Sequence, residues 1–127
     1  MRIVKSLQSK VCVDGSFMKE YLLDEPLTGT FLDFLGEFGT IRRIEHLKKP
    51  YFSFEKEHFL SVKGFIGDKT VEVRYPKESR EIVADYFHLL LFYEREGNAG
   101  IVKMKGIEDS MHEKIRVRMG LAEGSTP

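Results

Sequence analysis

The sequence predicts a single α+β domain: a mainly antiparallel sheet of about five to six strands, two main helices on one face, and a short C-terminal helix. Three observations support this class. Apolar residues alternate in several short segments, two longer segments repeat them at helical spacing, and 42% of the 127 residues are hydrophobic. We expect residues 1–121 to form the domain and residues 122–127 a disordered tail.

Residues 3–13 and 17–23 form the first predicted hairpin. Apolar side chains alternate with polar ones in both segments, and the intervening "DGS" is a turn signal. A three-residue loop would pair Val13 with Phe17 and Leu7 with Leu23. Both apolar rows would then face the core.

A short helix is predicted over residues 30–38. Its apolar side chains recur at helical spacing: Phe31, Phe34, Leu35 and Phe38. Thr30 and Asp33 resemble a capping box, and Gly39 stands where a C-terminal cap glycine belongs. At this spacing we expect the phenylalanines to pack in the core and not to stack on a cofactor.

The hairpin around "GFIGDKT" is predicted from three agreeing signals. With Gly67 and Asp68 as its loop, residues 58–66 and 69–75 pair so that every apolar side chain lies on one face. The same register places Lys63 opposite Glu72 on the other face. The apolar alternation, the turn residues and the cross-strand charges therefore all predict the same pairing of the two strands.

Residues 77–96 form the long predicted helix, and its apolar residues exceed one stripe because Leu89 and Phe92 lie outside it. Residues 101–105 are predicted to add a last strand, and residues 107–119 a short amphipathic helix. Without the first hairpin, the order β, α, β, β, α, β fits the split arrangement of ferredoxin-like folds.

Charge and cysteine content limit the function classes. Twenty basic residues balance twenty acidic ones, so the chain lacks the basic excess of most nucleic-acid-binding and membrane-surface proteins. Cys12 is the single cysteine, which excludes an intramolecular disulfide and favours a reducing, cytoplasmic location. The longest uncharged run, residues 86–93, is too short to cross a bilayer.

No catalytic or cofactor motif is recognisable. The four histidines at positions 46, 58, 88 and 112 lack the spacing of a compact metal site, and there is no phosphate-binding glycine loop. We expect Cys12 to be a small apolar residue on a strand, without a catalytic role. The sequence thus predicts no metal and no cofactor, and no residue in it argues for enzymatic activity, although the pattern leaves such activity open.

The stretch "IRRIEHLKKPYFSF", residues 41–54, combines cations with aromatics. Phe52 and Phe54 share the parity of Leu60 and Val62, so we expect them in the core, where they cannot stack on bases. The basic side chains and histidines in and just after this stretch form a candidate polar or anion site: Arg42, Arg43, His46, Lys48, Lys49 and His58.

Three functions are compatible with these patterns. The leading hypothesis is a protein-interaction or homodimerising module whose interface would consist of Leu89, Phe92, Met111, Ile115 and Met119. Alternatively, the terminal helix folds back and covers this surface within the chain. A second hypothesis is a small-molecule-binding or enzymatic domain with a pocket between sheet and helices near His46 or His58. A third is weak nucleic-acid binding through residues 42–51, which the neutral net charge disfavours.

Overall fold

The computed structural model describes residues 1–57 and 59–118. Met119 and the predicted tail, residues 122–127, lie outside these ranges. The strands are β1 (Ile3–Val11), β2 (Phe17–Leu23), β3 (Thr40–Ile44), β4 (Tyr51–Lys56), β5 (Leu60–Phe65) and β6 (Thr70–Tyr75). The helices are α1 (Gly29–Leu35), α2 (Arg80–Tyr93), the 3₁₀ turn η1 (Glu94–Glu96) and α3 (Gly97–Arg118). Within the described ranges no helix has the length and hydrophobicity needed to span a membrane.

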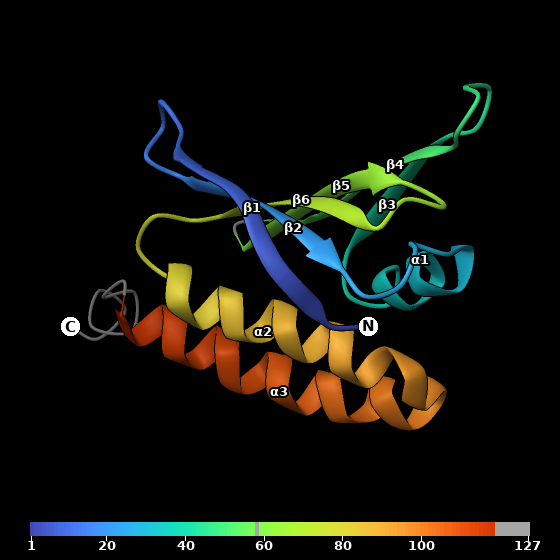
Figure 1. Cartoon of the computed structure of the whole chain (residues 1–127). Coiled ribbons are helices and arrows are strands. Elements are labelled where there is room, and N and C mark those ends of the chain that lie inside the picture. The colour runs from blue at the N-terminus through green and yellow to red at the C-terminus, as the bar shows by residue number, and fades with distance from the viewer. Residues whose placement is uncertain (58, 119–127) are drawn as a thin grey trace.

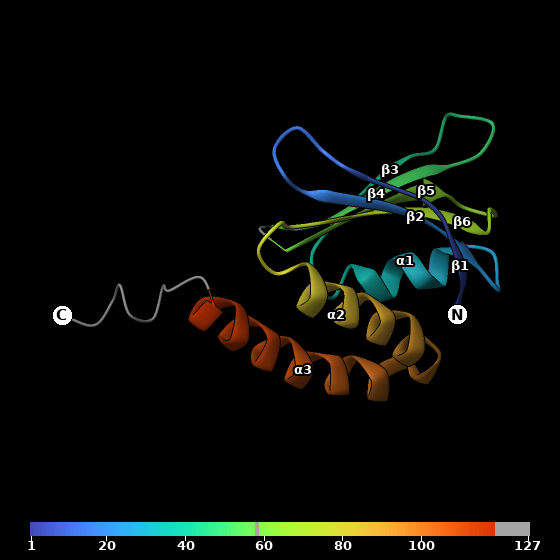
Figure 2. The same cartoon turned by 60° about the vertical axis from the view of Figure 1, so that its left-hand side comes forward.

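The strands form one antiparallel sheet in the order β1-β2-β6-β5-β4-β3 (Figure 1). All the helices lie on the same side of it, with α1 and α2 against the sheet and α3 beneath α2 (Figure 2). The α+β class is therefore confirmed. The ferredoxin-like arrangement is wrong, because α1 connects β2 to the far edge strand β3, and because residues 101–105, the last strand that this arrangement needs, belong to a helix.

The hairpin of β5 and β6 has the predicted register. Val62 pairs with Val73, and Lys63 pairs with Glu72 on the opposite face. Gly67 adopts a φ of 96°, which the turn requires and which a side chain would strain. Phe52 and Phe54 of the neighbouring β4 are 0% exposed, so their predicted core position is also confirmed.

The first hairpin differs from its prediction. Val11 pairs with Phe17, and Ile3 with Leu23, with irregular pairing between them. The loop is longer than predicted because Gly15, at a φ of 87°, and the Asp14 carboxylate, which accepts hydrogen bonds from Ser16, build a wider turn. β1 stands at the edge of the sheet with largely exposed side chains, and its apolar row does not face the core.

Helix α1 begins and ends earlier than predicted. The hydroxyl of Thr28, and not that of Thr30, accepts the capping hydrogen bond from the Phe31 N–H at 3.1 Å, and Gly36 is the C-cap. Gly39 has another role, because a Cβ there would lie 2.5 Å from the Glu55 carbonyl oxygen. Its missing side chain lets the chain entering β3 pack against β4.

Residues 101–105, predicted as a strand, belong to α3, a helix of 22 residues. Gly97, at a φ of 57°, turns the chain after η1 so that α3 runs back along α2. The buried side chains of α3 follow helical spacing: Met104, Glu108, Met111 and Ile115. Packing of these side chains on α2 therefore favours a helix, although "IVKMK" alternates as a strand does.

Candidate functional site

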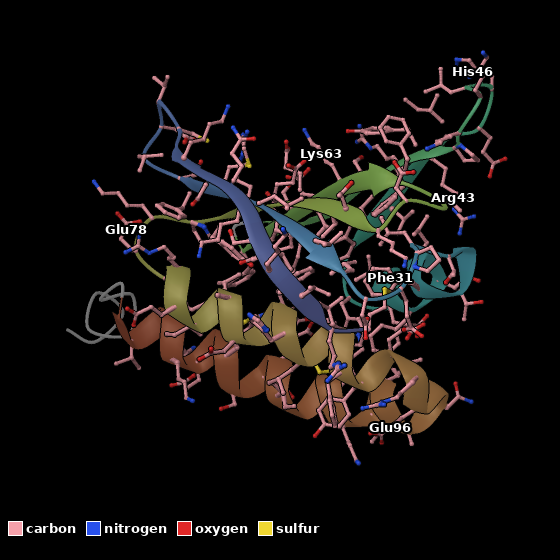
Figure 3. The ribbon with its side chains drawn as sticks, in the orientation of Figure 1. Phe31, Arg43, His46, Lys63, Glu78 and Glu96 are labelled. Carbon is pink, nitrogen blue, oxygen red and sulfur yellow. The ribbon has the colours of Figure 1, made fainter. Side chains whose placement is uncertain are left out.

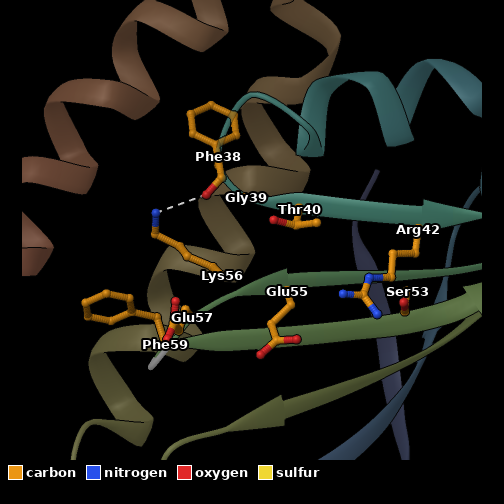
Figure 4. Close-up of a pocket in the computed structure, with 9 residues that line it drawn as sticks. All are labelled: Phe38, Gly39, Thr40, Arg42, Ser53, Glu55, Lys56, Glu57 and Phe59. Carbon is orange, nitrogen blue, oxygen red and sulfur yellow. Dashed lines mark hydrogen bonds between the residues drawn. The ribbon is translucent and has the colours of Figure 1, made fainter.

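A pocket of about 430 Å³ opens where the ends of β3 and β4 meet the loop after α1 (Figure 4). We call it the rim pocket. Its walls combine two aromatic rings with several polar side chains and one glycine. The lining residues are Phe38, Gly39, Thr40, Arg42, Ser53, Glu55, Lys56, Glu57 and Phe59.

Arg42 and Glu55 place two opposite charges on one wall of the rim pocket. Arg42 lies opposite Ser53, and Glu55 lies opposite Thr40, so all of these side chains share the sheet face away from the helices. Among the described residues, neither Arg42 nor Glu55 takes part in an ion pair. A second pocket, of about 440 Å³, differs because its Arg2 and Asp24 neutralise each other.

A buried ion pair supports the floor of the rim pocket. Lys56 Nζ lies 2.5 Å from Glu108 Oε2 and donates a second hydrogen bond to the Phe38 carbonyl oxygen at 3.1 Å. The Tyr86 hydroxyl donates to the same carboxylate oxygen at 3.3 Å. Burial, with the adjacent Glu108 charge, raises the pKa of Tyr86, which therefore remains a donor. These bonds compensate the cost of burying both charges.

His112 lies beside this ion pair. Its ring stacks on Phe59 with centroids 4.7 Å apart, and its Nε2 is buried without a hydrogen-bond partner among the described residues. Burial lowers the pKa of His112, and the positive charge of Lys56 lowers it further against the opposing effect of Glu108. The folded chain therefore holds His112 in its neutral form.

The lowered pKa of His112 predicts a pH dependence of stability. Below the unfolded-state pKa of about 6.5, the unfolded chain binds a proton at His112 that the folded chain still excludes. The free energy of unfolding should therefore fall as the pH drops from about 6.5 through the folded pKa. His112→Phe keeps the stacking and should remove this contribution. Urea denaturation of the wild type and of His112→Phe between about pH 7 and pH 5 measures the free energy of unfolding. The same pH dependence in the two proteins would contradict the expectation.

The predicted anion site is not assembled as one cluster. Arg42 lines the rim pocket, whereas Arg43 bonds to Asp33 at 3.0 Å and Lys49 to Asp68 at 2.6 Å. His46 lies at the tip of the loop between β3 and β4, away from the pocket (Figure 3). Lys48 is exposed in the same loop. His58 is outside the described residues, although its neighbours Glu57 and Phe59 line the pocket.

The predicted interface residues are divided between surface and core. Phe92 is 46% exposed and Leu89 is half-buried. Met111 and Ile115 are 3% and 4% exposed, because α3 packs on α2 within the chain. The fold-back arrangement is therefore the one observed, and these two side chains are not available to a partner.

Comparison of the chain with protein-family models, curated proteins and solved structures gave no match.

Proposed function

We propose that the protein binds a small zwitterionic metabolite, such as a free amino acid, in the rim pocket. The observation that carries this proposal is the presence of two opposite charges, Arg42 and Glu55, on one pocket wall, neither of them in an ion pair with a described residue. A ligand with a carboxylate and an ammonium group can satisfy both, whereas a simple anion would meet repulsion from Glu55. Charge-assisted hydrogen bonds are the stronger kind, so this match favours binding.

The rest of the lining fits such a ligand. Thr40 and Ser53 place hydroxyl groups on the same face as the two charges and can complete the hydrogen bonding. Phe38 and Phe59 offer apolar walls for the body of the molecule. The volume of about 430 Å³ lies within the usual range for small-ligand sites, roughly 300–1,000 Å³.

The buried Lys56–Glu108 pair supports the proposal because it holds the walls of the rim pocket in place. Lys56 is joined both to α3 and to the Phe38 carbonyl, so it ties the floor of the pocket to the wall that carries Phe38. A wall held in place before binding lowers the ordering cost of binding.

Titration of the protein with three matched compounds, followed by two-dimensional NMR, tests the function. L-phenylalanine should give saturable shifts at the resonances of Thr40 and Ser53. Phenylpropionate and phenylethylamine, which each lack one charge, should bind about tenfold or more weakly. Arg42→Gln and Glu55→Gln should each weaken L-phenylalanine binding by a similar factor.

Lys69→Gln is the matched control, because Lys69 is exposed in the turn between β5 and β6 and does not line the rim pocket. It should bind like the wild type. If a panel of amino acids leaves the pocket resonances unchanged, or if either singly charged compound binds as well as the amino acid, the proposed ligand class is wrong.

A further inference from the structure

The sheet has an outer face, the side away from the helices, that no described element covers (Figure 2). Alternate residues of each strand place their side chains on it, among them Lys63 (Figure 3). The uncovered face of an antiparallel sheet is ordinarily polar, since it is solvated. The outer face departs from this pattern in one row of apolar side chains, which lies beside a row that carries charges of both signs.

The first of these rows is apolar. Ile44, Tyr51 and Phe65 are direct neighbours across β3, β4 and β5, and Leu22 of β2 occupies the same level of the sheet beside Thr70. Ile44 and Phe65 are each 39% exposed, and the rings of Tyr51 and Phe65 lie 5.2 Å apart. Apart from Thr70, the row consists of partly exposed aliphatic and aromatic side chains, which are typical of a protein interface.

The second row is charged, and its sign changes at the middle of the sheet. Lys63 of β5 lies opposite Glu72 of β6, which in turn lies opposite Glu20 of β2. Toward the other edge the same row continues through Ser53 to Arg42. In the part of the chain that the structure describes, no ion pair involves Lys63, Glu72 or Glu20. One half of the row is therefore basic and the other half acidic.

We propose that the outer face binds a second copy of this chain in a two-fold symmetric dimer. A two-fold axis parallel to the strands, between β5 and β6, reverses the order of the strands in the facing copy. Lys63 of each copy then faces the partner's Glu72, and Tyr51 faces the partner's Leu22. Face-to-face sheets keep their strands nearly aligned, so a row meets the corresponding row. The same contacts form twice, as an isologous interface requires.

Charge decides between a second copy and the main alternative occupant. Tyr51, Phe65 and Lys63 could serve a single-stranded nucleic acid, with bases stacked on the rings. The acidic side chains of Glu20 and Glu72 share this face and would repel phosphate groups. A second copy presents the same row in reversed order, so that Lys63 meets Glu72 twice and the basic half of each row faces the acidic half of the other.

Light scattering coupled to size-exclusion chromatography tests the dimer. The wild type should have twice the monomer mass of 14.7 kDa. Lys63→Glu alone and Glu72→Lys alone place like charges across the axis, which should raise the dimer Kd about a hundredfold. An equimolar mixture of these two variants should recover the dimer, because the acidic face of one then meets the basic face of the other. Lys114→Glu, an exposed change on α3, should leave the dimer intact.

Circular dichroism confirms that each variant is folded. If a charge variant does not fold, Phe65→Ala must give a monomer instead, since it removes part of the apolar row from an exposed position. A wild-type mass of 14.7 kDa at every concentration would overturn the proposal. A dimer that persists in both charge variants would also overturn it, because the contact would then lie elsewhere. The same holds if the protein is a monomer that retards single-stranded RNA in a gel, and if it loses this activity when Tyr51 is replaced.

Discussion

Glu108→Ala should lower the free energy of unfolding by about 3–5 kcal/mol, the usual cost of removing one partner from a buried ion pair. The side chains of Lys56 and Glu108 are only 10% and 12% exposed, so water cannot replace the lost carboxylate. Lys56 would keep one hydrogen bond, to the Phe38 carbonyl, and the Tyr86 hydroxyl would lose its acceptor. Guanidinium denaturation measures the loss.

A double variant separates the cost of an unpaired charge from the value of the pair. Lys56→Met combined with Glu108→Leu removes both charges and should restore most of the stability, because apolar replacement of a buried pair is often neutral. Asp33→Asn, which breaks the exposed Arg43–Asp33 pair, is the surface control and should have a much smaller effect. If Glu108→Ala behaves like Asp33→Asn, the Lys56–Glu108 pair is solvated and the interpretation fails.

Local signals explain which elements could be predicted. In the β5–β6 hairpin, Gly67, the apolar alternation and the Lys63–Glu72 pair all lie within one turn and its flanks, so they specify the register together. In the first hairpin the same alternation was misleading. Irregular pairing in β1 shifts the register, and Val11 and Val13, 68% and 108% exposed, lie outside the core.

Residues 101–105 show a different limit. "IVKMK" alternates as a strand does, yet Met104 also falls in the helical series with Glu108, Met111 and Ile115. A short apolar segment fits both periods, and the choice depends on the neighbouring α2, which the local sequence does not contain. The glycines at 97 and 100 allow a tight turn between the two packed helices.

The candidate site depends on contacts between distant segments. Lys56 and Glu108 are 52 residues apart, and nothing in either segment indicates the other. One signal was present, since Lys56 shares the parity of Phe52 and Phe54 and therefore had to point toward the core. A buried lysine requires a partner, so its parity alone could have prompted a search for a buried carboxylate.

Phe54→Ala tests the same parity argument and should destabilise the protein by about 3–5 kcal/mol. Phe54 is 0% exposed, pairs with Val62 on the core side of the sheet, and packs against the chain at Gly39, where a Cβ would lie 2.7 Å from its ring. Truncation would leave a cavity that rigid strands on both sides cannot close. Urea denaturation provides the measurement.

Phe92→Ala supplies the matched control, because it removes the same atoms from a side chain that is 46% exposed on α2. Phe92→Ala should lower the free energy of unfolding by no more than about 1 kcal/mol, which is the scale of the ring's contacts with Arg95 and Tyr93. Equal losses for the two variants would mean that Phe54 is not a core residue. The aromatics of residues 41–54 would then become available for binding, and the division of this stretch between a buried Phe52–Phe54 side and an exposed Tyr51 side would be wrong.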